Sequence, residues 1–248
     1  PGAGKSTIIS CLIEHWVKDG KRVAILSVDP SSPFHKGAIL GDRIRMKDWY
    51  MNPNVFIRSL ATRGHLGGLM NGMIELTTLL QSVGFDIILI ETVGVGQSEV
   101  EIAGLADTTI VVLVPEAGDE VQMMKSGLME IAQIFVVNKS DRPDAEAFTN
   151  HLLHMMREGL GEQHTIPVIK TIASQQLGID ELVAAIAAQQ SNGLSTKRKK
   201  QLLISKLYQI IAAHQMRSLN GPMIEAELAT AMQQKHFNIF TFSRKYYK

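Results

Sequence analysis

The sequence has only one cysteine, Cys11, and aromatic residues make up only 6% of its 248 positions. A single cysteine cannot form an internal disulfide, which favours a reducing compartment. Long apolar runs are lacking too. Apolar runs such as those at 87–90 and 110–114 are far shorter than the ~20 residues that a membrane helix needs. The sequence therefore predicts a cytoplasmic protein without a membrane partner.

An excess of charge of one sign is also lacking. Lys and Arg number 25 against 24 Asp and Glu, which gives a net charge of +1. This balance supplies no overall attraction to nucleic acid or to an anionic membrane, so neither is expected as a partner. Apolar residues are plentiful, at 45% of the chain, which excludes a disordered protein and suffices for the core of one large or two modest domains.

Short apolar runs alternate with amphipathic stretches over most of the chain. Strands are expected at 22–29, 54–60, 85–91, 108–114, 131–138 and 166–173. Helices are expected directly after residue 7 and at 37–49, 69–80, 121–130, 143–158 and 179–189. Nearly continuous apolar strands that alternate with helices indicate an α/β fold, a mostly parallel sheet flanked by helices. Ligands bind such sheets at the carboxyl ends of the strands.

The composition changes near residue 193. A basic run at 197–200 precedes a stretch whose apolar residues have helical spacing, and one face of this helix would carry Leu203, Leu207, Ile210, Ile211 and His214. We therefore expect two parts, an α/β domain at 1–193 and a helical C-terminal arm at 194–248 that packs or dimerises.

Residues 1–7 read PGAGKST and match the second half of a Walker A loop, G-x-x-x-x-G-K-[ST]. In such a loop, backbone N–H groups surround the phosphates, Lys5 would contact the terminal phosphates and Ser6 would bind Mg²⁺. The helix that follows would add its positive N-terminal dipole. The first Walker glycine and its strand are expected upstream of residue 1. The alternative is a chance glycine turn that caps a helix.

The sequence NKSD at 138–141 directly follows an apolar run. It matches the N-K-x-D pattern of guanine-binding proteins. Asp141 would accept hydrogen bonds from the ring N–H and amino group of guanine, a pair of donors that adenine does not offer. Asn138 would tie this loop to the phosphate loop, and the Lys139 stem would pack over the base. Four such residues also occur by chance at surface turns.

Acidic residues follow two of the predicted strands. Glu91 and the nearby Gly94 resemble the end of a Walker B strand and the glycine that contacts the γ-phosphate. Glu91 would hold a water bound to Mg²⁺, and Asp29 and Asp42 could approach the same ion. Capping of a turn or helix is the alternative, and for Asp42 it is nearly as favoured. Val95 occupies the usual place of the catalytic glutamine, so weak intrinsic hydrolysis is expected.

Six motifs in order complete a family pattern: DPSS at 29–32, GAILGDR at 37–43, RGHLGG at 63–68, ETVGVGQSE at 91–99, AGDE at 117–120 and NKSD at 138–141. Together they closely resemble the ArgK/MeaB (MMAA-type) family of P-loop GTPases, of the SIMIBI structural class. The resemblance implies a chaperone that gates cofactor loading or protection of an adenosylcobalamin-dependent methylmalonyl-CoA mutase. It also implies a homodimer formed through the C-terminal arm and, in a eukaryote, a mitochondrial matrix location.

The resemblance also implies the site residues. GTP or GDP would be bound by Gly2, Ala3, Gly4, Lys5, Ser6, Thr7, Asn138, Lys139, Asp141, Ile172, Ala173 and Ser174. The ion would be Mg²⁺, with Ser6, Asp29, Asp42 and Glu91 around it, and catalysis would involve Lys5, Glu91 and Gly94. Residues 118–125 resemble a mobile loop that relays the nucleotide state to the mutase.

This chain departs from the family pattern in two places that matter. Ile172 and Ala173 stand where the family has a Ser-Ala pair, so a backbone N–H would have to replace the hydroxyl at the base. Glu116 replaces a small residue before the mobile loop. The alternatives are a GTPase or kinase linked to basic amino-acid transport, a nickel-insertion GTPase and an inactive nucleotide-binding scaffold. The chain lacks kinase motifs and has few candidate nickel ligands.

Overall fold

The computed structural model describes residues 2–29, 46–61, 73–92, 105–116, 128–160 and 166–191, and then residues 204, 207–208, 210–212, 214–216, 219–233 and 237–246. The chain divides into two compact units, Pro1–Lys199 and Lys200–Lys248. The domain boundary predicted at residue 193 lies outside the described residues and stays a prediction. No helix in the described segments is both long enough and apolar enough to cross a membrane.

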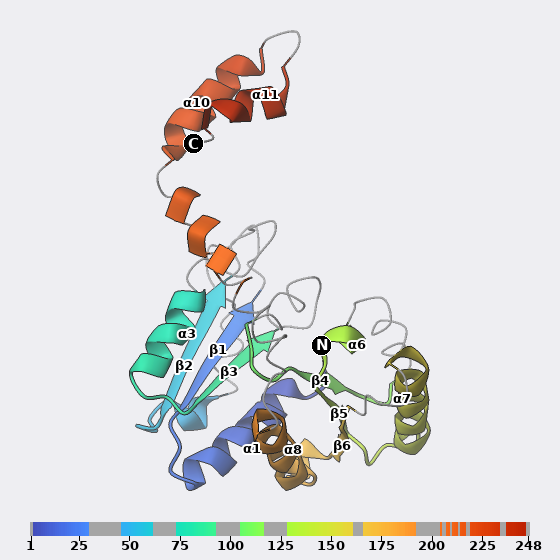
Figure 1. The fold of residues 1–248 in the computed structure, drawn as a ribbon. Coiled ribbons are helices and arrows are strands. Elements are labelled where there is room, and N and C mark those ends of the chain that lie inside the picture. Colours follow the sequence, from blue (N-terminus) through green and yellow to red (C-terminus); the bar gives the residue numbers. More distant parts are fainter. Residues whose placement is uncertain are drawn as a thin grey trace. The chain divides into compact units, whose positions relative to one another are not determined.

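The first unit is built on parallel strands, as the sequence predicts (Figure 1). One sheet has the order β2-β1-β3, with β1 at Val23–Asp29, β2 at Val55–Ala61 and β3 at Ile87–Thr92. The other has the order β4-β5-β6, with β4 at Ile110–Leu113, β5 at Ile134–Asn138 and β6 at Val168–Thr171. All four strand pairs are parallel, which confirms the α/β fold.

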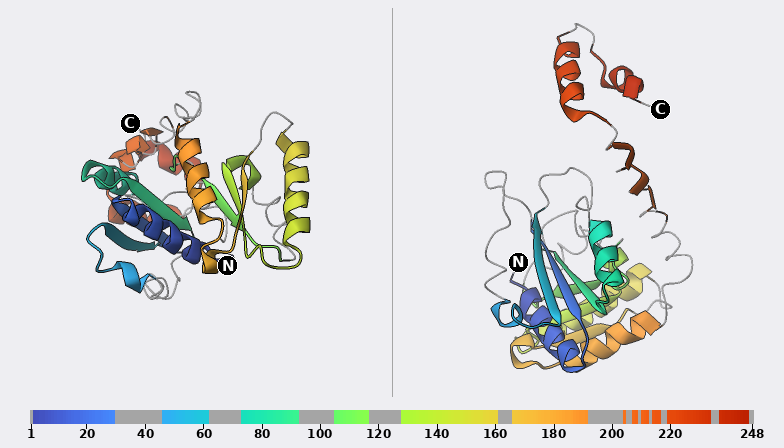
Figure 2. Two further views of the ribbon diagram at one scale, coloured as in Figure 1. Left: turned by 90° about the horizontal axis from the view of Figure 1, so that it is seen from below. Right: turned by 90° about the vertical axis from the view of Figure 1, so that its left-hand side faces the viewer.

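Helices cover both faces of these sheets (Figures 1 and 2). Helices α1 (Lys5–Lys18) and α8 (Ile179–Ser191) pack on one face of both sheets, where Ile13 and Leu182 meet Ile25 of β1 and Val136 of β5. On the opposite face, α3 (Met73–Ser82) packs on β1 and α7 (Ala145–Leu160) packs on β5. Alternate residues of β1 enter the two layers because side chains of a strand point to opposite faces.

Several expected strands are shorter than predicted; β4, for example, covers only Ile110–Leu113 of the run at 108–114. Ile131 belongs to α6 (Leu128–Ile131), and β5 begins only at Ile134. At its far end, β6 stops at Thr171, because Ile172 turns back to hydrogen-bond Leu177 and Ala173 starts the 3-10 helix η2 (Ala173–Gln175). These apolar residues lie in the core or beside the sheet, so hydrophobicity alone could not mark the strand ends.

Three expected helices are described only in part. The end of the helix predicted at 37–49 is the 3-10 helix η1 (Lys47–Trp49), and the rest lies outside the described residues. The helix predicted at 69–80 is described from residue 73, as α3. The helix predicted at 121–130 is described only from residue 128, as α6.

In the second unit, all regular structure among the described residues is helical. Its elements are α10 (Gly221–Ala231), α11 (Ile239–Ser243) and the 3-10 helix η3 (Arg244–Tyr246), preceded by helical residues between 204 and 216. Asn220 caps α10 by accepting from the backbone N–H of Met223, and Pro222 occupies the first turn. None of the described side chains of α10 or α11 is buried.

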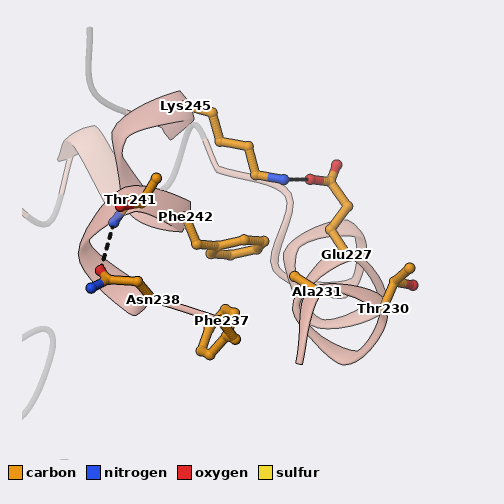
Figure 3. A pocket seen from close by; sticks show the side chains of 8 residues that line it. All are labelled: Glu227, Thr230, Ala231, Phe237, Asn238, Thr241, Phe242 and Lys245. Carbon is orange, nitrogen blue, oxygen red and sulfur yellow. Dashed lines mark hydrogen bonds and ion pairs between the residues drawn. The ribbon is translucent and has the colours of Figure 1, made fainter. Parts of the chain in front are cut away.

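A cavity of about 550 Å³ lies between α10 and the segment of α11 and η3 (Figure 3). Lys245 places its ammonium 4.2 Å from the centre of the Phe242 ring and pairs with Glu227, which also accepts from the Tyr246 hydroxyl. These contacts fold the end of the chain back onto α10. The ion pair is exposed, so it contributes little stability by itself.

Candidate functional site

The turn that leads into α1 has the backbone form of an anion-binding loop. Gly2 and Gly4 both have φ near +83°, a conformation that side chains rarely adopt, and Gly4 is the N-cap of α1. The first turn of α1 contains no acidic residue. The N–H groups that begin a helix have no partner within it, so those of Lys5, Ser6 and Thr7 are available to a phosphate.

The Asn138 side chain joins this turn to the carboxyl ends of β5 and β6. Its Nδ2 donates to the backbone carbonyl of Ala3 at 2.8 Å. Its Oδ1 accepts from the Thr171 hydroxyl at 3.0 Å and from the backbone N–H of Ala173 at 3.1 Å. Asn138 is only 3% exposed, so these bonds replace water for a buried amide. The bond to the phosphate loop is the one that the N-K-x-D pattern predicts.

The same amide explains why residue 4 is glycine. A Cβ atom built on Gly4 would lie 2.2 Å from Asn138 Nδ2. Any side chain there would displace the amide, in addition to the strain of a positive φ. Gly4 therefore serves both the turn of the phosphate loop and the close approach of Asn138.

Ser6 and Glu91 meet at the carboxyl end of β3. The Ser6 hydroxyl donates to Glu91 Oε1 at 3.0 Å, and both side chains are half-buried. A hydroxyl that donates its single proton keeps two lone pairs. Ser6 could therefore give an oxygen ligand to Mg²⁺ while it still bonds Glu91. Hydroxyl and carboxylate oxygens are the donors that Mg²⁺ prefers, so these two residues fit the predicted ion.

The loop after β5 has a strained backbone. Lys139 has φ +57°, a value that is uncommon for a residue with a side chain. Ser140 donates to the Thr171 carbonyl through both its N–H and its hydroxyl. Asp141 is exposed in this loop, with its carboxylate accessible to a ligand. Asn138 and Ser140 therefore hold this loop on β6, and Asp141 is exposed at its surface.

Glu116, three residues after the end of β4, contacts this same loop. Its carboxylate pairs with the guanidinium of Arg142 and lies 3.8 Å from the ammonium of Lys139. The sequence suggests only that Glu116 departs from the family pattern before the mobile loop. These ion pairs with the 139–142 loop could not be predicted, because no sequence pattern shows that the segment after β4 lies close to the loop after β5.

The predicted base-holding residues lie in and beside η2. Ala173 is buried, and its N–H is already bonded to Asn138, so this N–H does not face a base. Ser174 is exposed, whereas Ile172 is half-buried and bonds Leu177 through its backbone. Cys11 of α1 also contacts this segment, since its thiol donates to the Ala173 carbonyl at 3.3 Å. Burial, and secondarily the negative charge of Glu14, raises the pKa of the Cys11 thiol.

Several predicted residues cannot be placed. Asp42 and Gly94 lie outside the described residues, as does the predicted mobile loop at 118–125. Asp29 ends β1, but only its backbone is described. Across the described segments, no three His, Cys, Asp or Glu side chains are grouped as a metal site. Thr171, which bonds Asn138, is not among the residues that the sequence predicts for the site, because its only local signal is its place at the end of an apolar strand.

The sequence profile of the methylmalonyl-CoA mutase-associated GTPase MeaB matches residues 1–221. The chain belongs to the MeaB family. A relative from Pyrococcus abyssi is 46% identical over 211 residues, which is 82% of this chain and 65% of that protein. The GTPase ArgK of Escherichia coli is 40% identical over 192 residues, 75% of this chain and 58% of ArgK. The chain therefore spans less than two thirds of either relative.

A mouse protein named methylmalonic aciduria type A homolog, mitochondrial, is also similar to this MeaB-family chain. It is 45% identical over 141 residues, 57% of this chain and 34% of the mouse protein. Together, the family match and these names confirm the ArgK/MeaB resemblance drawn from the six motifs.

Solved structures of HypB proteins share the fold of this MeaB-family member. HypB from Helicobacter pylori, in complex with nickel, has a TM-score of 0.57 at 19% identity and covers 79% of this chain and 86% of that chain. HypB from Archaeoglobus fulgidus has a TM-score of 0.51, also at 19% identity, and the match covers 75% of this chain and 84% of that chain. At this identity the likeness establishes a shared α/β fold alone, and the nickel belongs to the H. pylori protein.

We predict that Asn138→Ala lowers the free energy of unfolding by about 2–5 kcal/mol, because it leaves a carbonyl, a hydroxyl and an N–H buried without their partner. Urea unfolding of the purified chain measures this change. Ser140→Ala is the control, since it removes one hydroxyl bond in the same loop and should cost about 1 kcal/mol or less. Equal stability of the two variants would contradict the role given to Asn138.

Proposed function

We propose that the protein binds and hydrolyses GTP as an accessory chaperone of an adenosylcobalamin-dependent methylmalonyl-CoA-type mutase, for which it gates cofactor loading or protection. The observation that carries the GTP part is the Asn138 side chain, which bonds the phosphate loop at Ala3 and begins the loop that presents Asp141. A guanine base read by Asp141 and phosphates held at α1 would therefore belong to one ligand.

The residues of the site take distinct roles in this proposal. Backbone N–H groups of the loop at 2–7 hold the phosphates, and the Lys5 ammonium neutralises their charge as it builds up in the transition state. A bound Mg²⁺ would supply further positive charge to stabilise this transition state. Ser6 is the residue that would hold it, and Glu91 would accept from its water. Asp29, Asp42 and Gly94 are proposed to complete this neighbourhood.

Slow hydrolysis by the isolated protein is part of the proposal. Val95 occupies the position at which a glutamine orients water in Ras-like enzymes. The proposed partner would then supply or order the missing group. The family name and the name of the mouse relative support a methylmalonyl-CoA mutase as that partner.

A homodimer formed through the C-terminal arm, residues 194–248, is the remaining element of the proposal. Leu207 is 53% exposed, and Ile210 and Ile211 are exposed on the same helical face. Residues three and four apart on a helix are neighbours, so these side chains form one apolar strip. A second copy of this arm would bury the strip and so remove its apolar surface from water.

We expect Asp141→Asn to weaken GDP binding at least about 100-fold, because two hydrogen bonds from guanine to a carboxylate are lost. Xanthosine diphosphate has a carbonyl oxygen where guanine has its amino group, so it can accept a hydrogen bond from the new amide. It should therefore bind the variant more tightly than GDP does. Fluorescence titration with labelled nucleotides measures both. Asp144→Asn, an exposed acid in the same loop, is the control and should bind GDP like the wild type. Competition by ATP as effective as that by GTP would refute the guanine assignment.

Addition of the partner mutase should accelerate phosphate release from GTP at least ~10-fold, because a partner can supply groups that stabilise transition-state charge. A continuous phosphate assay measures this rate with and without the mutase. Lys5→Ala is the control for hydrolysis by contaminants, since it should show no accelerated rate. If the mutase neither binds nor accelerates the protein, the chaperone proposal is wrong. Transfer of the labelled γ-phosphate to a protein instead would support the kinase alternative.

Leu207→Asp should convert the dimer to a monomer, because a charge cannot be buried in an apolar interface without a partner. Light scattering coupled to gel filtration gives the molar mass. Met216→Asp places the same charge on the opposite helical face and should leave the dimer intact. A wild-type protein that is monomeric at micromolar concentration would contradict the dimer proposal.

A further inference from the structure

Ser27 is a buried polar residue that the site described so far does not use. It lies in β1 and is 2% exposed. Within the described segments, its hydroxyl has no hydrogen-bond partner. Burial of an unpaired hydroxyl is unfavourable, and most buried side-chain polar atoms in proteins are paired. An alanine at this position would not carry that cost. The buried hydroxyl therefore indicates a binding partner that the structure does not contain.

The sheet register places Ser27 beside the proposed magnesium site. Ser27 is the register partner of Glu91 on β3 and of Ser59 on β2, in parallel pairing. Neighbouring strands lie about 4.8 Å apart, and register partners project on the same face of the sheet. Val23 and Ile25, which share that face with Ser27, pack in the core under α1. Ser27 therefore projects on the face that carries the phosphate helix.

A polar row thus crosses the sheet where the apolar core under α1 ends. Ser59, Ser27 and Glu91 follow one another on adjacent strands, and the Ser6 hydroxyl of α1 reaches the row at Glu91. Of the two serines in this row, only Ser27 is fully buried. Ser59 is partly exposed, so water can hydrogen-bond to its hydroxyl. The unpaired group is therefore the one next to Glu91.

We propose that Ser27 is a positioning residue for Mg²⁺ at the nucleotide site, where its hydroxyl accepts a hydrogen bond from a metal-bound water that Glu91 also holds. This inference rests on the proposed function. Mg²⁺ keeps several of its waters when it binds to proteins, and each such water has two protons to donate. The Glu91 carboxylate can accept one and the Ser27 hydroxyl the other, which satisfies the buried serine.

A purely structural role for Ser27 makes a different prediction. If the hydroxyl only fills space, its replacement by alanine leaves magnesium binding unchanged. A hydroxyl without a partner in the metal-free protein adds no stability there, so Ser27→Ala should leave unfolding in urea unchanged or shift it to higher urea concentration. Urea unfolding of the protein in EDTA without nucleotide gives this reference, and it also shows that the variant folds.

The deciding experiment is a Mg²⁺ titration of the full chain with bound fluorescent GDP. Ser27→Ala should raise the half-saturating Mg²⁺ concentration about 2- to 10-fold, the loss expected for one hydrogen bond between neutral groups. GDP affinity in EDTA should stay within about twofold of the wild type, because the phosphate and base contacts are intact. Ser59→Ala, the same change one strand farther from Glu91, is the matched control and should titrate like the wild type.

The two proposals fail in different ways. If wild-type protein binds GDP and responds to Mg²⁺ but Ser27→Ala gives a superimposable titration, the Ser27 inference is wrong and the proposed function stands. An equal rise for Ser27→Ala and Ser59→Ala would also overturn it, because the effect would then be general to the sheet. A wild-type chain that shows no response to Mg²⁺ would overturn the proposed function and the Ser27 inference together.

Discussion

Three hydrogen bonds to one buried amide hold together the end of the sheets at which we propose that the nucleotide binds. Asn138 bonds the turn at Ala3, the last residue of β6 at Thr171 and the first residue of η2 at Ala173. Asn138 and Ala3 are 135 positions apart in the sequence, so this bond joins distant segments. The close packing of Gly4 follows from this amide, and so does the end of β6, where the chain leaves the sheet to present an N–H to Asn138.

The apolar layers make that contact possible. Helices α1 and α8 share one core that draws residues from both sheets, so the start of α1 is fixed relative to the ends of β3 and β5. The Ser6–Glu91 bond and the Cys11–Ala173 bond are two further polar links from α1 to this end of the sheets. Burial in the core supplies most of the stability, and these directional bonds then select one arrangement of the loops.

Much of this architecture could be predicted from local pattern. Alternation of apolar strands and helices indicates the α/β fold, and N-K-x-D after a strand indicates the bond from Asn138 to the phosphate loop, which is present. The strand ends could not be predicted, since Ile131 and Ala173 are as apolar as the strands they adjoin. Nor could Ser27 be paired with Glu91 or Glu116 with Arg142, because register and loop approach depend on packing between distant segments.

The contrast between Asn138 and Asp141 has a consequence for how such a protein can change over time. The first is buried at the junction of three segments, whereas the second is exposed on the loop surface only three positions later. If Asp141 reads the base as proposed, a substitution at this exposed acid would alter which base is preferred and leave the scaffold intact. A substitution at the amide damages the scaffold itself. Under the proposed function, base preference could therefore change through single substitutions at the surface, whereas phosphate binding would be lost together with the scaffold.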